Sequence, residues 1–409
     1  MLQAIFAGIV AAITGFASSF AVVIAGLSAV GASDAQAASG LFALCLAVGL
    51  CCIVVPWLSK VPISFAWSTP GAALLLAAGA TTGNFAAAVG AFLVCAALIV
   101  LCGLWPALGR VITGIPKPIA GAMLAGILFP ICVAPVTATI EQPLVAVPMI
   151  LVWLLLARLA PRWAVPGAML VAAIGIAVIA GPGVFAGHGV LPRLEFVAPV
   201  FEPAVIVSLG LPLFIVTMAG QNVPGFAVMS TFGYTVAPRP VLLTTGLASA
   251  GGALFGGHVI NLAAITAALM ASPEAHPDRS KRWVATVSSG FVYLALGVGA
   301  GAAAALVAAA PPVIILAVAG LALLGALASS VAGALEEPEH RVSAIATFLV
   351  TASGVSIVGI GSAFWGLLVG GLFLLWLAPA RRQRAASAPE TTSETAPEDP
   401  ALAAQPDAS

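Results

Sequence analysis

The stretch ISFAWSTPGAALLL, residues 63–76, decides the fold, because it interrupts a chain that otherwise consists of long apolar runs. Residues 63–68 are expected to form a short extended piece, and a short helix is expected to start at Thr69. Threonine is a suitable N-cap residue, and Pro70 is tolerated in the first turn because an N–H at that position has no helical partner.

A second stretch, GHVINLAAIT, residues 257–266, repeats this pattern in the other half of the chain. An extended piece is expected at 257–260, and a short helix is expected from Asn261, which is an equally suitable N-cap. Paired short segments of this kind at matching positions in two halves indicate the binding site of a transporter.

The rest of the chain is strongly apolar: 62% of its 409 residues are hydrophobic and 7% are charged. A soluble domain is roughly one-quarter charged. The apolar runs are about 20 residues long, which is enough to cross the hydrocarbon core of a bilayer as a helix. The 6 cysteines lie inside these runs and are interpreted as small buried hydrophobic residues, not as a disulfide framework or a metal site. We therefore expect an all-α polytopic membrane protein.

About fourteen transmembrane segments are expected. They are placed at 2–29, 36–57, 68–80, 85–105, 118–137, 142–158, 164–181, 203–231, 241–256, 261–272, 283–306, 312–333, 342–356 and 360–378. With the N-terminus in the cytoplasm, every one of the 14 Lys and Arg residues except Arg193 falls on the cytoplasmic side. This agrees with the positive-inside rule and predicts that both termini are cytoplasmic.

The segments divide into two sets of seven, and duplication of an odd-numbered unit places the two copies in the membrane with opposite orientations. The first inverted repeat is expected at 1–184 and the second at 203–380, with a periplasmic linker at 185–202. Residues 381–409 are rich in Ala, Pro, Ser, Thr and acidic residues, so a disordered cytoplasmic tail is expected there.

The two short helices are expected to meet with their N-termini near the middle of the bilayer. Irregular backbone is tolerated at that depth only where it lines a protected cavity, and free N–H groups at a helix N-terminus attract an anion without any Lys or Arg. The expected donors are the N–H groups of Gly71 and Ala72 and those of residues 262–264. The residues of these two stretches that are assigned to substrate binding are Trp67, Ser68, Thr69, Gly71, Ala72 and Asn261. The alternative is that both short helices serve only for packing.

His258 is an ionisable residue inside an apolar stretch, which is a functional hypothesis by default. Because histidine titrates near physiological pH, His258 is a candidate for substrate binding and for proton coupling. An anion beside it would stabilise the imidazolium, so that proton and substrate would bind cooperatively. The alternative is a neutral histidine that satisfies backbone groups.

Two long segments also carry polar and aromatic candidates. Gln221 and Asn222 have amides that are costly to expose to lipid, and contacts between helices are the alternative explanation for them. Phe16 and Trp67 offer stacking surfaces for an aromatic substrate, and Ser18 belongs to a polar patch in the first segment. Ordinary packing is the alternative for both rings.

Several classes of protein are disfavoured. No acidic residue lies at the centre of a predicted segment, and no Gly-Lys-Ser/Thr phosphate-binding loop is present. No nucleophile–base pair or cluster of metal ligands is visible, so neither an enzyme nor a cofactor is expected.

Five motifs resemble the benzoate membrane-transport (BenE) family. They are FAWSTPGAAL at 65–74, PLFIVTMAGQNVPG at 212–225, GGHVINLAAIT at 256–266, PEAHPD at 273–278 and GIGSAFWG at 359–366. The likeness extends from about residue 4 to 378. It implies kinship with the nucleobase and sulfate transporter fold, which has seven-plus-seven inverted repeats, a core and a gate domain, and substrate between the third and tenth segments. The nucleobase relatives use acidic residues in segments eight and ten, which this chain lacks.

The resemblance implies a proton-coupled importer of benzoate, or of a similar aromatic carboxylate, in a bacterial inner membrane. A transporter of the same fold for another small anion or a nucleobase is the first alternative, and a channel or a membrane scaffold is the second. The expected partners are benzoate or a related aromatic acid, a proton and the lipid bilayer. A homodimer is left open, and no nucleic acid is expected.

Overall fold

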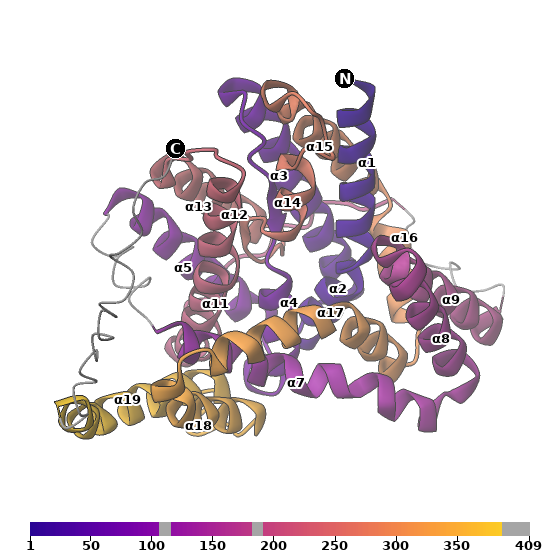
Figure 1. Cartoon of the computed structure of the whole chain (residues 1–409). Helices are drawn as coiled ribbons and strands as arrows, with labels where there is room; N and C mark the ends of the chain where they lie inside the picture. The colour runs from indigo at the N-terminus through magenta and orange to yellow at the C-terminus, as the bar shows by residue number, and fades with distance from the viewer. Residues whose placement is uncertain (106–115, 182–190, 387–409) are drawn as a thin grey trace, which may run out of the picture.

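The computed structural model describes residues 1–105, 116–181 and 191–386, and these residues are mostly helical (Figure 1). The elements before residue 191 are α1 (Leu2–Ala17), α2 (Phe20–Ala29), α3 (Asp34–Ser59), β1 (Phe65–Trp67), α4 (Thr69–Thr82), α5 (Phe85–Leu104), α7 (Lys117–Glu141), α8 (Pro143–Leu159), the 3-10 turn η1 (Pro161–Trp163) and α9 (Ala164–Ala180).

The remaining elements follow residue 191. They are α10 (Pro203–Val205), the π-helical turn η3 (Ile206–Gly210), α11 (Leu211–Thr217), the π-helical turn η4 (Met218–Asn222), α12 (Val223–Thr231), α13 (Pro238–Ala253), β2 (Ile260–Leu262), α14 (Ile265–Ala271), η5 (Arg279–Lys281), α15 (Trp283–Val298), α16 (Ala300–Ala308), α17 (Pro312–Leu335), η6 (Pro338–His340), α18 (Arg341–Ala352) and α19 (Ser362–Ala386).

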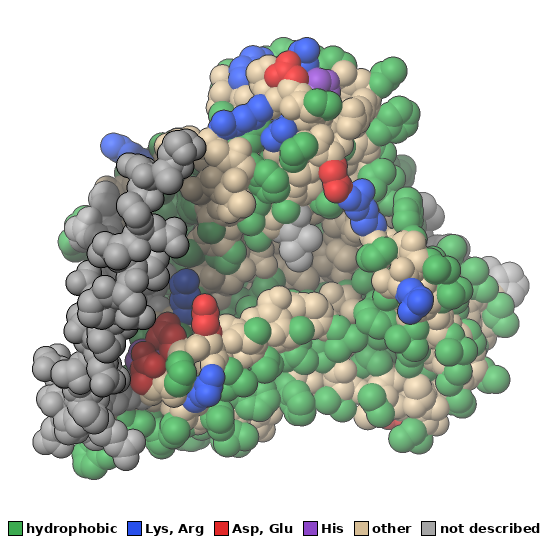
Figure 2. Space-filling model, in the orientation of Figure 1, with side chains coloured by type: hydrophobic (Ala, Val, Ile, Leu, Met, Phe, Trp, Pro, Cys, Tyr) green, Lys and Arg blue, Asp and Glu red, His purple; other side chains and the backbone are tan. Residues whose placement is uncertain are grey.

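Among the described residues, seven helices are long and apolar enough to cross a membrane, or up to eight if the bent pair Arg279–Val298 and Ala300–Ala308 counts as one span. Large apolar side chains such as Leu144 and Trp376 are exposed, and Figure 2 shows hydrophobic side chains over much of the visible face. An apolar surface of this extent is stable in contact with lipid. The chain is therefore a polytopic helical membrane protein.

The ends of the chain differ slightly from the prediction. α19 runs to Ala386, past the predicted end of the last segment at 378. The rest of the expected tail, 387–409, lies outside the described residues, as do Arg110 and the start of the expected linker.

The helices pack in two groups. In the first group, α3 lies against α15, α5 against α13, α1 against α14 and α15, and α4 against α2 and α11. In the second group, α7 lies against α17 and α18, α18 against α19, and α8 against α9. Figure 1 shows α7, α17, α18 and α19 along the lower side, below α1, α3 and α13. We refer to these sets as the first and second helix groups.

Glycine allows the closest of these contacts. A Cβ on Gly49 of α3 would lie 2.9 Å from the carbonyl oxygen of Gly290 on α15, and a Cβ on Gly290 would lie 2.6 Å from the carbonyl oxygen of Gly49. Small residues at helix contacts are the usual route to close packing in membranes, where apolar lipid removes the hydrophobic drive for association.

Candidate functional site

Two short strands, one from each half of the chain, pair with each other. β1 and β2 pair antiparallel with Ala66 opposite Asn261, and the Ser68 N–H donates to the Val259 carbonyl oxygen over 3.0 Å. Each strand is followed by a short helix. We call β1 with α4 the first arm and β2 with α14 the second arm.

Side chains from neighbouring helices satisfy the outer edges of this two-stranded sheet. On the second arm, the Asn222 Oδ1 accepts the Leu262 N–H over 2.8 Å. On the first arm, the Cys52 Sγ accepts the Phe65 N–H over 3.4 Å. Backbone groups inside a membrane protein need such partners because no bulk water reaches them. Asn222 is completely buried and fixes a strand in this structure.

The predicted cap of the first short helix is wrong by one residue. Thr69 is already helical, whereas Ser68 keeps extended backbone and its Oγ accepts the Gly71 N–H over 3.1 Å. The Ala72 N–H donates to the Ser68 carbonyl oxygen over 2.8 Å. The N–H groups of Gly71 and Ala72, which were expected to face an anion, are therefore both used within the protein.

The predicted start of the second short helix is also wrong. Asn261 belongs to β2, because its backbone pairs with Ala66, and α14 begins only at Ile265. The Asn261 Nδ2 donates to the Leu262 carbonyl oxygen over 2.9 Å, and its buried Oδ1 has no partner. No side chain caps α14, whose N-cap position is Ala264.

A cavity of about 220 Å³ lies between the two arms. Four of the predicted site residues line it: Ser18, Trp67, Thr69 and Gln221. The other lining residues are Thr14, Gly15, Ser19, Ala66, Pro70, Ala263, Ala264, Thr266, Leu269, Tyr293, Ala322, Leu323, Gly325 and Ala326. We call this space the central cavity.

Aromatic rings form one wall of the central cavity. The Trp67 ring packs edge-to-face against Tyr293, with centroids 5.6 Å apart, and against Phe16, with centroids 6.0 Å apart. The Trp67 Nε1–H donates to the Ser19 Oγ over 2.9 Å, which fixes the orientation of the indole. A Cβ on Gly15 would lie 2.6 Å from the Tyr293 hydroxyl oxygen, so glycine is needed for this ring to fit.

The polar groups of the central cavity are neutral. Hydroxyls come from threonine and serine side chains and an amide comes from Gln221, while no Lys, Arg, Asp or Glu lines the described wall. The Thr14 Oγ1 is buried without a hydrogen-bond partner. Buried polar groups are normally paired, so this hydroxyl is suited to a ligand. The cavity can thus hold an aromatic ring and offer hydrogen bonds to a polar substituent.

His258 and the other predicted site residues lie outside the cavity lining. The His258 side chain is fully buried, its Nδ1 lies 3.1 Å from the Val259 carbonyl oxygen, and its Nε2 has no partner. That carbonyl oxygen also accepts the Ser68 N–H, so His258 is linked to the first arm through one backbone oxygen.

Three parts of the cavity wall were not predicted. Thr266 lies only five positions after Asn261, but its place depends on where α14 starts. Tyr293 is one of only 2 tyrosines in the chain, and a phenol inside an apolar run is a signal that could have identified it. The α17 wall at 322–326 consists of small and apolar residues that carry no such signal.

One group among the described residues could hold a metal ion. The ligand atoms of Glu337, Glu339 and His340 lie within 4.8 Å of one another at the turn between α17 and α18. None of these residues lines the central cavity. Partly exposed acidic turns are common without an ion, so this group suggests no cofactor chemistry.

A sequence profile described as benzoate membrane transport protein matches residues 1–375. The inner membrane protein YdcO of Escherichia coli K12 is 41% identical over 373 residues, which cover 90% of this chain and 94% of that protein. The benzoate membrane transport protein of Acinetobacter baylyi is 35% identical over 316 residues, which cover 76% of this chain and 79% of that protein.

Solved structures share the fold at low identity. The murine solute carrier 26 member A9 anion transporter, in its inward-facing state, is 17% identical with a TM-score of 0.59, and the match covers 92% of this chain and 68% of that one. The transmembrane domain of a cyanobacterial bicarbonate transporter is 16% identical with a TM-score of 0.55, and the match covers 90% and 97%.

Proposed function

Because this chain belongs to the benzoate membrane transport family, we propose that it imports benzoate or a similar aromatic carboxylate together with a proton. Family membership makes the chain a membrane transporter and not an enzyme.

The size and lining of the central cavity support this substrate class. Its volume is about 220 Å³, and an apolar cavity of about 150 Å³ in another protein binds benzene. The difference leaves room for a carboxylate beside the ring. Trp67 and Tyr293 supply aromatic contacts, while the Thr14 hydroxyl, the Gln221 amide and the uncapped N-terminus of α14 supply donors.

Uptake into proteoliposomes tests this function. We expect labelled benzoate to accumulate when the outside is more acidic than the lumen, and to equilibrate without accumulation when the two pH values are equal. Benzoic acid also crosses bilayers unaided, so protein-free liposomes under the same gradient give the background. An initial rate of benzoate uptake no greater than this background would contradict the proposal, and uptake of a nucleobase instead would favour the alternative substrate class.

We also propose fourteen membrane segments in two inverted repeats, at 1–184 and 203–380, with both termini cytoplasmic. The packing pattern supports the repeat, because it is unchanged when the halves are exchanged. α3 packs against α15, and their counterparts in the other halves, α13 and α5, also pack against each other. In the same way α1 contacts α14, and their counterparts α11 and α4 contact each other. α7 packs against its own counterpart, α17. The distribution of Lys and Arg supports the orientation.

Transport is proposed to occur by an elevator or rocking motion of the first helix group against the second. Two further clefts lie between the groups. One of about 380 Å³ is lined by α4, α7 and the turn between α18 and α19, and one of about 320 Å³ is lined by α7, α17 and the helix that contains η4. Clefts between the two helix groups are compatible with such sliding.

His258 remains our proposed coupling residue, although it acts from behind the cavity wall. Its protonation would change the hydrogen bonding of the Val259 carbonyl oxygen and, through it, the Ser68 N–H at the start of the first arm. His258→Gln should retain benzoate binding and lose gradient-driven accumulation. If the His258→Gln protein still concentrates benzoate when the outside is acidified, another group carries the proton.

A further inference from the structure

A second cavity adjoins the central cavity. It has a volume of about 230 Å³ and lies between α1, α14 and the turn η1. Leu269 lines both cavities, so a single side chain stands between them. Phe6 and Val10 of α1 extend its apolar wall. We call this space the vestibule.

Unlike the central cavity, the vestibule is lined by charged groups, one of which is a guanidinium. Arg162, in η1 of the second helix group, forms an ion pair with Glu274, which follows α14 in the first group. The side chains of Arg162 and Glu274 are 53% and 69% exposed. Exposed pairs contribute only about 0.2–1 kcal/mol, so another carboxylate can readily replace Glu274.

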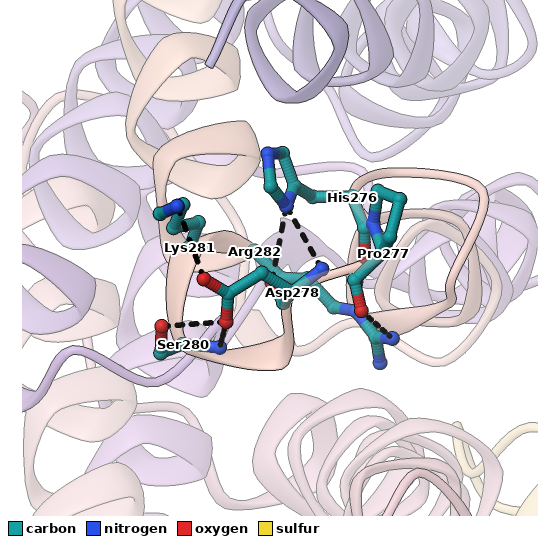
Figure 3. Close-up of polar contacts among 6 residues, drawn as sticks. All are labelled: His276, Pro277, Asp278, Ser280, Lys281 and Arg282. Carbon is teal, nitrogen blue, oxygen red and sulfur yellow. Dashed lines mark hydrogen bonds and ion pairs between the residues drawn. The ribbon is translucent and has the colours of Figure 1, made fainter.

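The loop that carries Glu274 is held firmly by its own contacts (Figure 3). The buried Arg282 donates to the carbonyl oxygens of His276 and Ala271, each over 2.8 Å. The Glu274 carbonyl oxygen accepts the Gln3 Nε2–H over 2.9 Å. The Glu274 side chain can therefore leave Arg162 without any change in the loop backbone, which makes exchange a matter of side-chain rotation.

We infer that the vestibule is a second, weaker site for an aromatic monocarboxylate, at which the carboxylate of the substrate replaces Glu274 on Arg162. Guanidinium binds carboxylates with two parallel hydrogen bonds, and its present partner is a carboxylate of the same chemistry. The ring of the substrate lies on Phe6, Val10 and Leu269. This inference rests on the proposed function, because it places the site one side chain away from the central cavity.

Cysteine protection tests the two cavities separately. Ala7→Cys lines the vestibule, and Gly325→Cys lines the central cavity at a position where a Cβ meets no atom within 4 Å. The rate of reaction with a charged thiol reagent is measured in purified full-length protein, with and without benzoate. The protein without an introduced cysteine gives the background.

Benzoate should slow labelling at both reporters. Arg162→Gln should abolish protection at Ala7→Cys and preserve it at Gly325→Cys. Glu274→Gln removes the competing carboxylate, and half-protection at Ala7→Cys should then need up to about fivefold less benzoate, the equivalent of a surface ion pair. Arg158→Gln removes a neighbouring charge that does not line the vestibule and should change neither reporter.

Two results would overturn the vestibule site and leave the proposed function standing. In the first, benzoate protects Gly325→Cys alone. In the second, protection at Ala7→Cys is unchanged by both Arg162→Gln and Glu274→Gln. Absence of protection at both reporters would contradict the proposed function as well. Glu274→Gln keeps the test decisive if Arg162→Gln does not fold.

Discussion

The two arms of the site have the same order of elements but different chemistry at their ends. α4 spans 14 residues and is capped by Ser68, whereas α14 spans 7 residues and has no side-chain cap. The N–H groups at the start of α4 are used internally, while Ala264 and Thr266 of the second arm line the central cavity. An approximate repeat in the fold therefore does not imply identical chemistry: the first arm contributes Trp67 and Thr69 to the cavity wall, and the second contributes Thr266 and the uncapped start of α14.

Filling the cavity between the arms should have the largest effect on function. Gly325→Leu places a side chain in the cavity from α17 without altering either arm, and no atom lies within 4 Å of its Cβ position. We expect benzoate binding to be lost and thermal stability to be retained. The matched control is Gly371→Leu on α19, where a Cβ also meets nothing within 4 Å and which lines none of the cavities described above. Normal binding by Gly325→Leu would show that the ligand lies elsewhere.

The strand edges of the two arms should differ in their sensitivity to substitution. Asn222→Leu leaves the buried Leu262 N–H of β2 without a partner, so the free energy of unfolding should fall by about 1–3 kcal/mol. Cys52→Ser keeps an acceptor for the Phe65 N–H of β1 and should change the free energy of unfolding by less than about 1 kcal/mol. Unfolding of the purified protein, followed by circular dichroism, measures both. Equal losses would remove this distinction between the arms.

The cap of the first arm gives a smaller effect. Ser68→Ala removes the acceptor of the Gly71 N–H and should destabilise the protein by about 1 kcal/mol, the usual contribution of an N-cap. Thr69→Ala should stay within about 0.5 kcal/mol of the native protein, since Thr69 caps nothing. A larger loss for Thr69→Ala than for Ser68→Ala would restore the cap predicted from the sequence.

Part of the site could be predicted from the sequence. The interruptions at Pro70 and Asn261 are local, so the existence of two short extended pieces and two short helices could be predicted. The start of α14 could not, because Asn261 is a good cap by type, yet its backbone pairs with Ala66 in the other half of the chain. Such long-range pairing leaves no local signal.

The same difference between local and long-range features applies to the cavity wall. Ser18, Trp67, Thr69 and Gln221 stand out as polar or aromatic residues in apolar runs, and all four line the central cavity. The α17 residues at 322–326 line it only because α17 packs against α2 of the first helix group, which depends on the whole fold. Hydropathy predicts that the chain forms several apolar helices long enough to cross a membrane, whereas the lateral packing of these helices leaves no such signal.

The smallest effect is expected in the loop that follows the second arm. Hydrogen bonds from the Ser280 hydroxyl and N–H lower the pKa of Asp278 from 3.8 to about 2, so the ionised carboxylate favours the folded loop. This contribution is fully present above pH 3.8 and is lost as the pH falls towards about 2. Asp278→Asn should therefore lower the Tm slightly at neutral pH and have no effect near pH 2. A difference in Tm that does not change with pH would contradict this origin.

The position of bound substrate in a crystal decides whether the central cavity is the binding site. Diffraction data from crystals grown with a bromobenzoate, collected at the bromine absorption edge, would give an anomalous peak at the ring. We expect the strongest peak in the central cavity beside Trp67 and Tyr293, with the carboxylate directed towards Thr14 or the start of α14. A strongest peak in either cleft between the helix groups, with the central cavity empty, would contradict this assignment.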